Sequence, residues 1–168
     1  MLLQDYGTFD QTGRGWRWVD RQPGCEAAAA DLIARYLVVE HAILSEPEAQ
    51  MLRWHEGQIR AGLGQDAAAL ALFTTTHSPE DAPLALTWNA YVDATVAFVK
   101  KDRAALVAAR ALLAAAPAPA DFDAMAAQYE QQTGRRPQWP PNIDVVDAMI
   151  TCFERPYRDA YADPACRT

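Results

Sequence analysis

The chain has 168 residues, of which 51% are hydrophobic and 22% are charged, and its formal net charge is −7. These values are typical of a folded domain with a sizeable apolar core, and they exclude a largely disordered chain. The excess negative charge disfavours nucleic acid as the main partner, because the phosphate backbone would be repelled. No stretch approaches the roughly 20 apolar residues that cross a bilayer, so we expect no membrane partner.

The cysteines and the N-terminus favour a cytoplasmic protein with free thiols. Residues 1–5 contain no apolar signal region. The three cysteines, Cys25, Cys152 and Cys166, are too sparse for a secreted disulfide framework and form no CxxC pair. The favoured interpretation is that the thiols are buried and free, and one disulfide with a spare thiol is the alternative.

Residues 1–24 differ from the rest of the chain, and we expect them to be irregular or extended. Glycines interrupt this segment, and Trp16 and Trp18 alternate around Arg17. The two tryptophans are expected to lie against the helical body. Interleaved Trp and Arg can also bind anions or nucleic acid, but the acidic composition of the chain disfavours that function.

From residue 25 onward the pattern is helical. Ser45, Pro47 and Glu48 form a capping box that separates the first two helices, and Gly64 is placed to end the second. Residues 25–116 are expected to form helical hairpins, and residues 117–168 the C-terminal helices and a tail broken by prolines. The expected helices cover residues 25–44, 46–63, 66–73, 84–101, 102–116, 121–133 and 142–153. The sequence therefore predicts a single all-α domain of about seven helices.

Residues 54–73, with the sequence WHEGQIRAGLGQDAAALALF, resemble a tetratricopeptide (TPR) repeat. In that family a glycine turn joins two antiparallel helices, which approach closely through small side chains. Gly57 matches the small residue of the first helix, Gly64 the turn glycine and Ala69 the small residue of the second helix. Phe73 matches the aromatic residue that closes the pair.

A weaker copy of this pattern follows, with Ala94, Lys101, Leu106 and Arg110 in the four corresponding places. Only Ala94 keeps the small side chain. The resemblance covers residues 50–116 and implies hairpins stacked as a short TPR-like superhelix. The alternative is a compact helical bundle, because any antiparallel helix pair with a glycine turn gives part of this signal.

The resemblance also implies a surface for a partner, because the first helices of the repeats line a concave wall. The candidates are Trp54 and Gln58 from one repeat, with Trp88, Tyr91 and Thr95 from the next; we call these five residues the aromatic face. Aromatic and polar side chains in a groove are typical anchors for a peptide. The leading hypothesis is a non-enzymatic module that binds another protein or a peptide, or a second copy of itself. The alternative interpretation is that these aromatic residues belong to the core.

A small enzyme or small-molecule binder is the competing hypothesis, and it depends on side chains near the first hairpin. Glu40 and His41 precede the turn at Ser45, and His55 and Glu56 follow it. Their offset along two helices does not suit a shared metal, so no metal and no cofactor is expected. No serine-hydrolase motif occurs either, and no catalytic residue is predicted. His55 is expected to be partly buried and bonded to a carbonyl or a neighbouring acid.

Overall fold

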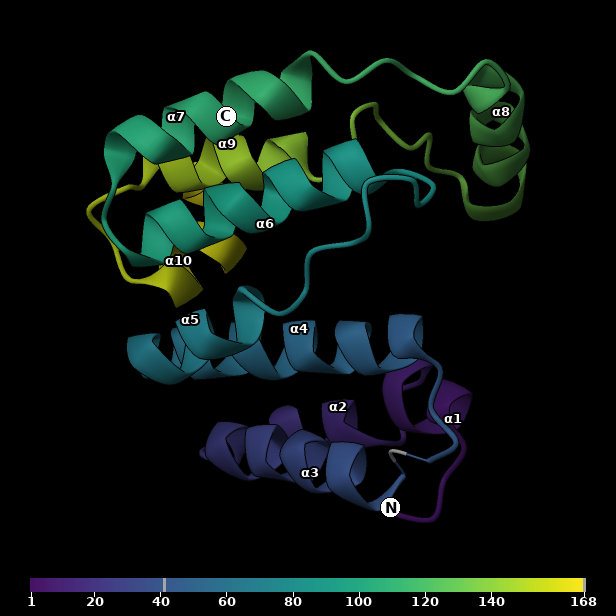
Figure 1. Cartoon of the computed structure of the whole chain (residues 1–168), viewed down its shortest axis with the longest axis vertical. Helices are drawn as coiled ribbons and strands as arrows, with labels where there is room; N and C mark the ends of the chain where they lie inside the picture. The colour runs from purple at the N-terminus through teal and green to yellow at the C-terminus, as the bar shows by residue number, and fades with distance from the viewer. Residues whose placement is uncertain (41, 168) are drawn as a thin grey trace. The chain divides into compact units, whose positions relative to one another are not determined.

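The computed structural model describes residues 1–40 and 42–167, and it is all-helical, as the sequence predicts (Figure 1). The described residues group into two compact units, whereas the sequence predicts one domain. The first unit holds residues 1–40, 42–77 and 156–158, and the second holds residues 78–155 and 159–167. Within the described residues, every helix is too short or too polar to cross a membrane.

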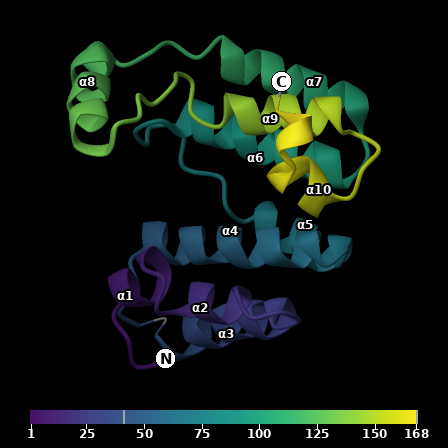
Figure 2. The ribbon, with the colours of Figure 1, turned by 180° about the vertical axis from the view of Figure 1, so that it is seen from behind.

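The first unit contains α1 (Tyr6–Gln11), α2 (Trp16–Asp20), α3 (Glu26–Val39), α4 (Glu46–Gly62) and α5 (Asp66–Phe73). The helix α4 packs against both α3 and α5, and α2 packs against α3 (Figures 1 and 2). The core of this unit is formed by the buried side chains of Phe9, Trp16, Ile33, Tyr36 and Leu52. The rings of Phe9 and Tyr36 stack with their centroids 3.8 Å apart.

The expectation that residues 1–24 are irregular or extended is wrong, because α1 and α2 lie in this segment. The Asp5 carboxylate caps α1 by accepting a hydrogen bond from a backbone N–H of its first turn. Helices this short are not stable alone, and here burial of Phe9 and Trp16 in the core supports them. Gly15 allows α2 to begin against α1, because a Cβ there would lie 1.8 Å from the carbonyl oxygen of Phe9.

The hairpin of α4 and α5 is held by glycine at two positions. A Cβ on Gly57 would lie 2.7 Å from the ring of Phe73, so only glycine allows the two helices to approach this closely. Gly64 has a φ of +72° and makes the left-handed turn between the helices. Ala69 is fully buried in α5. Gly57, Gly64, Ala69 and Phe73 therefore lie in one helical hairpin.

The second unit contains α6 (Ala85–Val99), α7 (Arg103–Ala114), α8 (Phe122–Thr133), α9 (Ile143–Thr151) and the short 3₁₀ helix η1 (Pro164–Cys166). The last four residues of α10 (Tyr157–Ala162) also belong to it. The helices α6, α7 and α9 pack against one another, whereas α8 stands apart from them at the end of two extended connections (Figures 1 and 2). The helices α3 to α9 correspond to the seven that the sequence predicts.

The turn between α6 and α7 uses Lys101 where the first hairpin uses Gly64. Lys101 has a φ of +57°, a left-handed conformation that is costly for a residue with a Cβ. Its Nζ donates hydrogen bonds to the carbonyl oxygens of Phe153 at 2.8 Å and Arg155 at 3.0 Å. The ammonium also lies 4.2 Å from the ring centre of Phe98. These contacts offset the conformational cost and connect the turn to the segment after α9.

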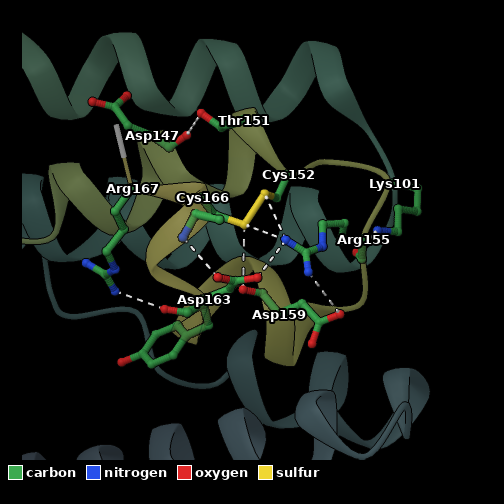
Figure 3. Close-up of a disulfide and its surroundings, with 11 residues drawn as sticks. Lys101, Asp147, Thr151, Cys152, Arg155, Asp159, Asp163, Cys166 and Arg167 are labelled. Carbon is green, nitrogen blue, oxygen red and sulfur yellow. Dashed lines mark hydrogen bonds and ion pairs between the residues drawn. A yellow bond between two sulfur atoms is a disulfide. The ribbon is translucent and has the colours of Figure 1, made fainter.

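Cys152 and Cys166 form a disulfide, which corrects the expectation of free thiols (Figure 3). Because α9 ends at Thr151, Cys152 follows the helix instead of lying within its apolar face. This position brings its Cα within 5.7 Å of the Cα of Cys166 in η1, a distance that a disulfide can bridge. Cys25 is the free thiol among the described residues and is partly exposed.

A cationic side chain lies directly beside this bond. Nη1 of Arg155 is 3.4 Å from the Cys166 sulfur and 2.8 Å from the carboxylate of Asp163 (Figure 3). Asp163 in turn caps η1 by accepting from the backbone N–H of Ala165. The C-terminal segment is therefore joined to the end of α9 by one covalent and one ionic link.

Candidate functional site

The aromatic face predicted from the sequence is divided between the two units and is mostly buried. Trp54 and Gln58 belong to α4, and Trp88, Tyr91 and Thr95 belong to α6. Trp54 and Tyr91 each expose 3% of their surface, and Thr95 exposes none. Gln58 and Trp88 are partly exposed.

The buried members of the face have identifiable packing roles. The ring of Trp54 lies 4.8 Å from that of Phe73, and Trp88 meets Tyr91 edge-on at 6.1 Å. The Thr95 hydroxyl donates to the Tyr91 carbonyl of its own helix at 3.0 Å. Solvent therefore does not reach Trp54, Tyr91 or Thr95. This burial agrees with the alternative interpretation, in which these residues belong to the core.

A surface pocket of about 380 Å³ in the first unit brings together side chains from α1, α2 and α4. Two of its residues come from α1, one from α2 and four from α4. Three of the α4 residues are spaced four positions apart and the fourth lies three positions before one of them, so they share one face of that helix. The described residues that line the pocket are Tyr6, Gln11, Arg17, Pro47, Glu48, Met51 and His55. The pocket thus combines the apolar side chains of Pro47 and Met51 with mostly polar ones.

A buried carboxylate fixes the histidine of this pocket. Asp10 is fully buried, and its Oδ1 lies 2.7 Å from Nδ1 of His55 and accepts a hydrogen bond from Trp16 Nε1 at 2.8 Å. Burial acts to raise the pKa of Asp10, but the hydrogen bond and Coulombic interaction with His55, the hydrogen bond from Trp16 and the positive charge of Arg17 outweigh it and lower the pKa. Asp10 is therefore ionised at neutral pH and orients the imidazole.

This arrangement confirms that His55 is partly buried and bonded to an acid. The acid is Asp10, 45 residues earlier in the chain. Glu56 is instead buried in an ion pair with Arg60 at 2.6 Å, and neither Glu56 nor Glu40 is among the described residues that line the pocket. His41 lies outside the described residues.

Arg17 completes the polar end of the pocket. Its Nε donates to the backbone carbonyl of Asp10 at 2.7 Å, and Nη2 lies 3.4 Å from Nε2 of His55. Because a guanidinium can only donate, Nε2 is the acceptor, and Nδ1 carries the proton that faces Asp10. The guanidinium also lies 4.2 Å from the ring centre of Trp16. Within residues 1–40 and 42–167, Arg17 forms no ion pair with a carboxylate.

Tyr6 and Glu48 give the rest of the wall its polarity. Burial, the negative charge of Asp10 and a hydrogen bond with Asp10 raise the pKa of Tyr6 to about 12, so its hydroxyl keeps its proton. This hydroxyl accepts from the Gln11 amide at 3.3 Å. The Glu48 carboxylate accepts from the hydroxyl and the backbone N–H of Ser45, and these bonds lower the pKa of Glu48. The pocket therefore has a cationic end at Arg17 and one anionic residue on its wall.

The sequence pointed to parts of this site but not to their association. The sequence predicts the environment of His55 and the capping box that positions Glu48, whereas anion binding by the segment of Trp16 and Arg17 was considered and disfavoured. Asp10 and Tyr6 were missed, because they lie in a segment that was expected to be extended. A capping signal at Asp5, a residue type that favours helix starts, was available for α1.

Comparison of the chain with known protein families, curated proteins and solved structures gave no significant match.

Proposed function

We propose that this protein is a non-enzymatic helical module that binds a small organic ligand in the pocket of the first unit. The observation that carries the proposal is the convergence of α1, α2 and α4 on a cavity of about 380 Å³, a size typical of small-molecule sites. Its polar groups are held in place by partners of their own, as a site that recognises a ligand without rearrangement requires.

The state of His55 favours binding over catalysis. An imidazole paired with a buried carboxylate can act as a general base when Nε2 faces the substrate. Here the Arg17 guanidinium lies 3.4 Å from Nε2 and occupies the side of the imidazole that a substrate would have to reach. We therefore assign His55 a positioning role for Arg17.

Ligand screening tests the proposal directly. We expect weakly binding fragments to shift the amide NMR signals of α1, α2 and the first half of α4 in the labelled full-length chain. Met51→Lys places a charged chain in the pocket and should abolish these shifts. Met125→Lys, at a half-exposed methionine of the second unit, is the matched control and should leave them unchanged. Shifts scattered over both units, or insensitive to Met51→Lys, would contradict the proposal.

A second candidate function is the binding of another protein or a peptide, which the TPR resemblance implies. The close contact of Gly57 with Phe73 and the left-handed turns at Gly64 and Lys101 support it, because they give two hairpins of the expected type. Of the aromatic face, Gln58 and Trp88 keep partial exposure. If this function is correct, Trp88→Ala should weaken capture of a defined partner while Met51→Lys should not.

The cytoplasmic location expected from the sequence stays a prediction, as does the exclusion of nucleic acid by the net charge of −7. The disulfide between Cys152 and Cys166 counts against the cytoplasm, because such bonds persist mainly in oxidising compartments. Thiol labelling of the protein as isolated from its natural compartment would decide between a cytoplasmic and an oxidising location. If only one of the three cysteines is labelled, the protein comes from an oxidising compartment.

A further inference from the structure

Resting on the proposed function, we propose that the pocket recognises a small organic monoanion, a carboxylate attached to an apolar body. The carboxylate would lie at the Arg17 end, and the apolar body would lie against Pro47 and Met51. The inference begins from Arg17, a partly buried cation that lines the pocket and forms no ion pair with a carboxylate of the described residues. The positive charge of Arg17 already acts on the ionised Asp10 behind it, and an anion on the pocket side would add a charge-assisted hydrogen bond.

Arg17 is already fixed in the orientation that binding requires. Its Nε is anchored on the Asp10 carbonyl, its plane lies over the Trp16 ring, and Nη2 meets His55. Within residues 1–40 and 42–167, Nη1 has no hydrogen-bond partner, so it can donate to a ligand. Since the side chain is already ordered, little rotamer entropy is lost when the ligand binds.

An apolar wall completes the recognition. The Tyr6 hydroxyl keeps its proton but is already hydrogen-bonded to Asp10, so Arg17 supplies the polar contact to the ligand. This charge-assisted contact offsets part of the cost of the water that the anion loses. Pro47 and Met51 then remove the apolar body from water. An uncharged ligand of the same shape would gain only the apolar contact.

Glu48 sets the limit on the charge of the ligand. Its carboxylate is ionised and lies on the same pocket wall. One negative charge on the ligand gains a charge-assisted hydrogen bond from Arg17, which also faces the ionised Asp10, whereas a second negative charge would meet Glu48 without a further cation. This separates a carboxylate, with one charge, from a phosphate monoester, which carries close to two at neutral pH.

Phenylacetate and phenylacetamide are suitable probes, because they have nearly the same shape and differ in charge. We expect titration calorimetry and amide NMR shifts to give phenylacetate at least about tenfold tighter binding than phenylacetamide, the ratio expected for a charge-assisted hydrogen bond. Phenyl phosphate should bind more weakly than phenylacetate. The full-length chain is used throughout.

Three variants assign the effect to residues. Arg17→Gln should weaken phenylacetate binding by about tenfold or more and remove the preference over the amide, whereas Arg14→Gln, an exposed arginine nearby, should not. Met51→Lys should abolish phenylacetate binding, and it tests the site even if Arg17→Gln proves poorly folded. Glu48→Gln should tighten phenylacetate, because it removes a like charge.

The outcomes separate the inference from the proposed function. Equal binding of the acid and the amide in the pocket would overturn the carboxylate inference and leave the pocket as a ligand site. Tighter binding of phenyl phosphate would overturn it in favour of phosphate. Each ligand is tested at a concentration of about 10 mM, tenfold above a Kd of about 1 mM. If neither phenylacetate nor phenylacetamide then shifts the signals of α1, α2 and α4, both the carboxylate inference and the proposed function fail.

Discussion

At the scale of single residues, Asp10 organises the first unit more than any residue that the sequence singled out. Its carboxylate accepts hydrogen bonds from Trp16 and His55, and its backbone carbonyl accepts one from Arg17. Asp10 lies in α1, Trp16 and Arg17 in α2, and His55 in α4. The buried side chain of Asp10 and its backbone carbonyl thus join three helices. Replacing this side chain should lower the free energy of unfolding, whatever its effect on ligand binding.

The pH dependence of stability tests this role of Asp10. The folded-state pKa of Asp10 lies below its ordinary value of 3.8, so its contribution is present above pH 3.8 and is lost as the pH falls through the lower, folded pKa. We expect Asp10→Asn to reduce the free energy of unfolding by about 1–3 kcal/mol at pH 7. The difference from the wild type should shrink as the pH drops below about 4.

Urea unfolding of both proteins at several pH values between 7 and 3 measures this difference. Glu80→Gln, at an exposed loop acid, is the control and should change stability little at any pH. A constant difference between wild type and Asp10→Asn down to pH 3 would show that the carboxylate charge is not what stabilises the three helices.

At the scale of elements, the contact between α4 and α5 depends on the absence of a side chain at Gly57. Gly→Ala within a helix normally stabilises by up to about 1 kcal/mol. A Cβ on Gly57 would lie 2.7 Å from the Phe73 ring, so the ring must move or the helices must separate. We expect Gly57→Ala to destabilise by about 1–3 kcal/mol, the usual cost of overpacking.

Gly62 provides a matched control on the same helix. A Cβ there would have its nearest neighbour, Cβ of Arg158, at 4.0 Å, which is ordinary van der Waals contact. Gly62→Ala should therefore be neutral or slightly stabilising in denaturant unfolding. We therefore expect Gly57→Ala to lower the free energy of unfolding and Gly62→Ala to leave it unchanged or raise it slightly. If both stabilise, α4 and α5 do not approach as closely as described.

The elements from α3 to α9 were predictable because their signals are local. The capping box at Ser45 and the left-handed glycines at Gly64 and Gly134 mark ends that a sequence shows directly. The helices α1 and α2 were missed because five or six residues are too few for an apolar period to be read. The pairing of Asp10 with His55 was missed because contacts across 45 residues leave no local pattern.

The aromatic face illustrates a different limit. Helical spacing places Trp54 and Gln58 on α4 and Tyr91 and Thr95 on α6, and both helices form as predicted. Spacing identifies which side chains share a helix but not whether solvent or another element covers them. The same pattern of apolar residues occurs on a helix that lines a groove and on a helix that packs in a core. The burial of Trp54 and Tyr91 is therefore visible only in the structure.

At the scale of the whole molecule, the disulfide crosslinks residues of the second unit only. The Cys152–Cys166 bond spans 14 positions and closes the end of α9 onto η1, both within the second unit. The ion pair Arg155–Asp163 joins the same segments without a covalent bond, and Arg167–Asp144 joins the C-terminal segment to the first turn of α9. These pairs are partly exposed and contribute little by themselves, so the disulfide should dominate the stability of this corner.

Loss of the disulfide should therefore destabilise the chain by about 3 kcal/mol, the value expected for a loop of about 15 residues. The effect should be confined to the second unit. The double variant Cys152→Ser, Cys166→Ser should lower the midpoint of denaturant unfolding, and hydrogen exchange should become faster in α9 and η1 but not in α3 or α4. Cys25→Ser, which removes the free thiol, is the control and should do neither. Faster exchange throughout α3 and α4 would mean that the two units share their stability and unfold as one.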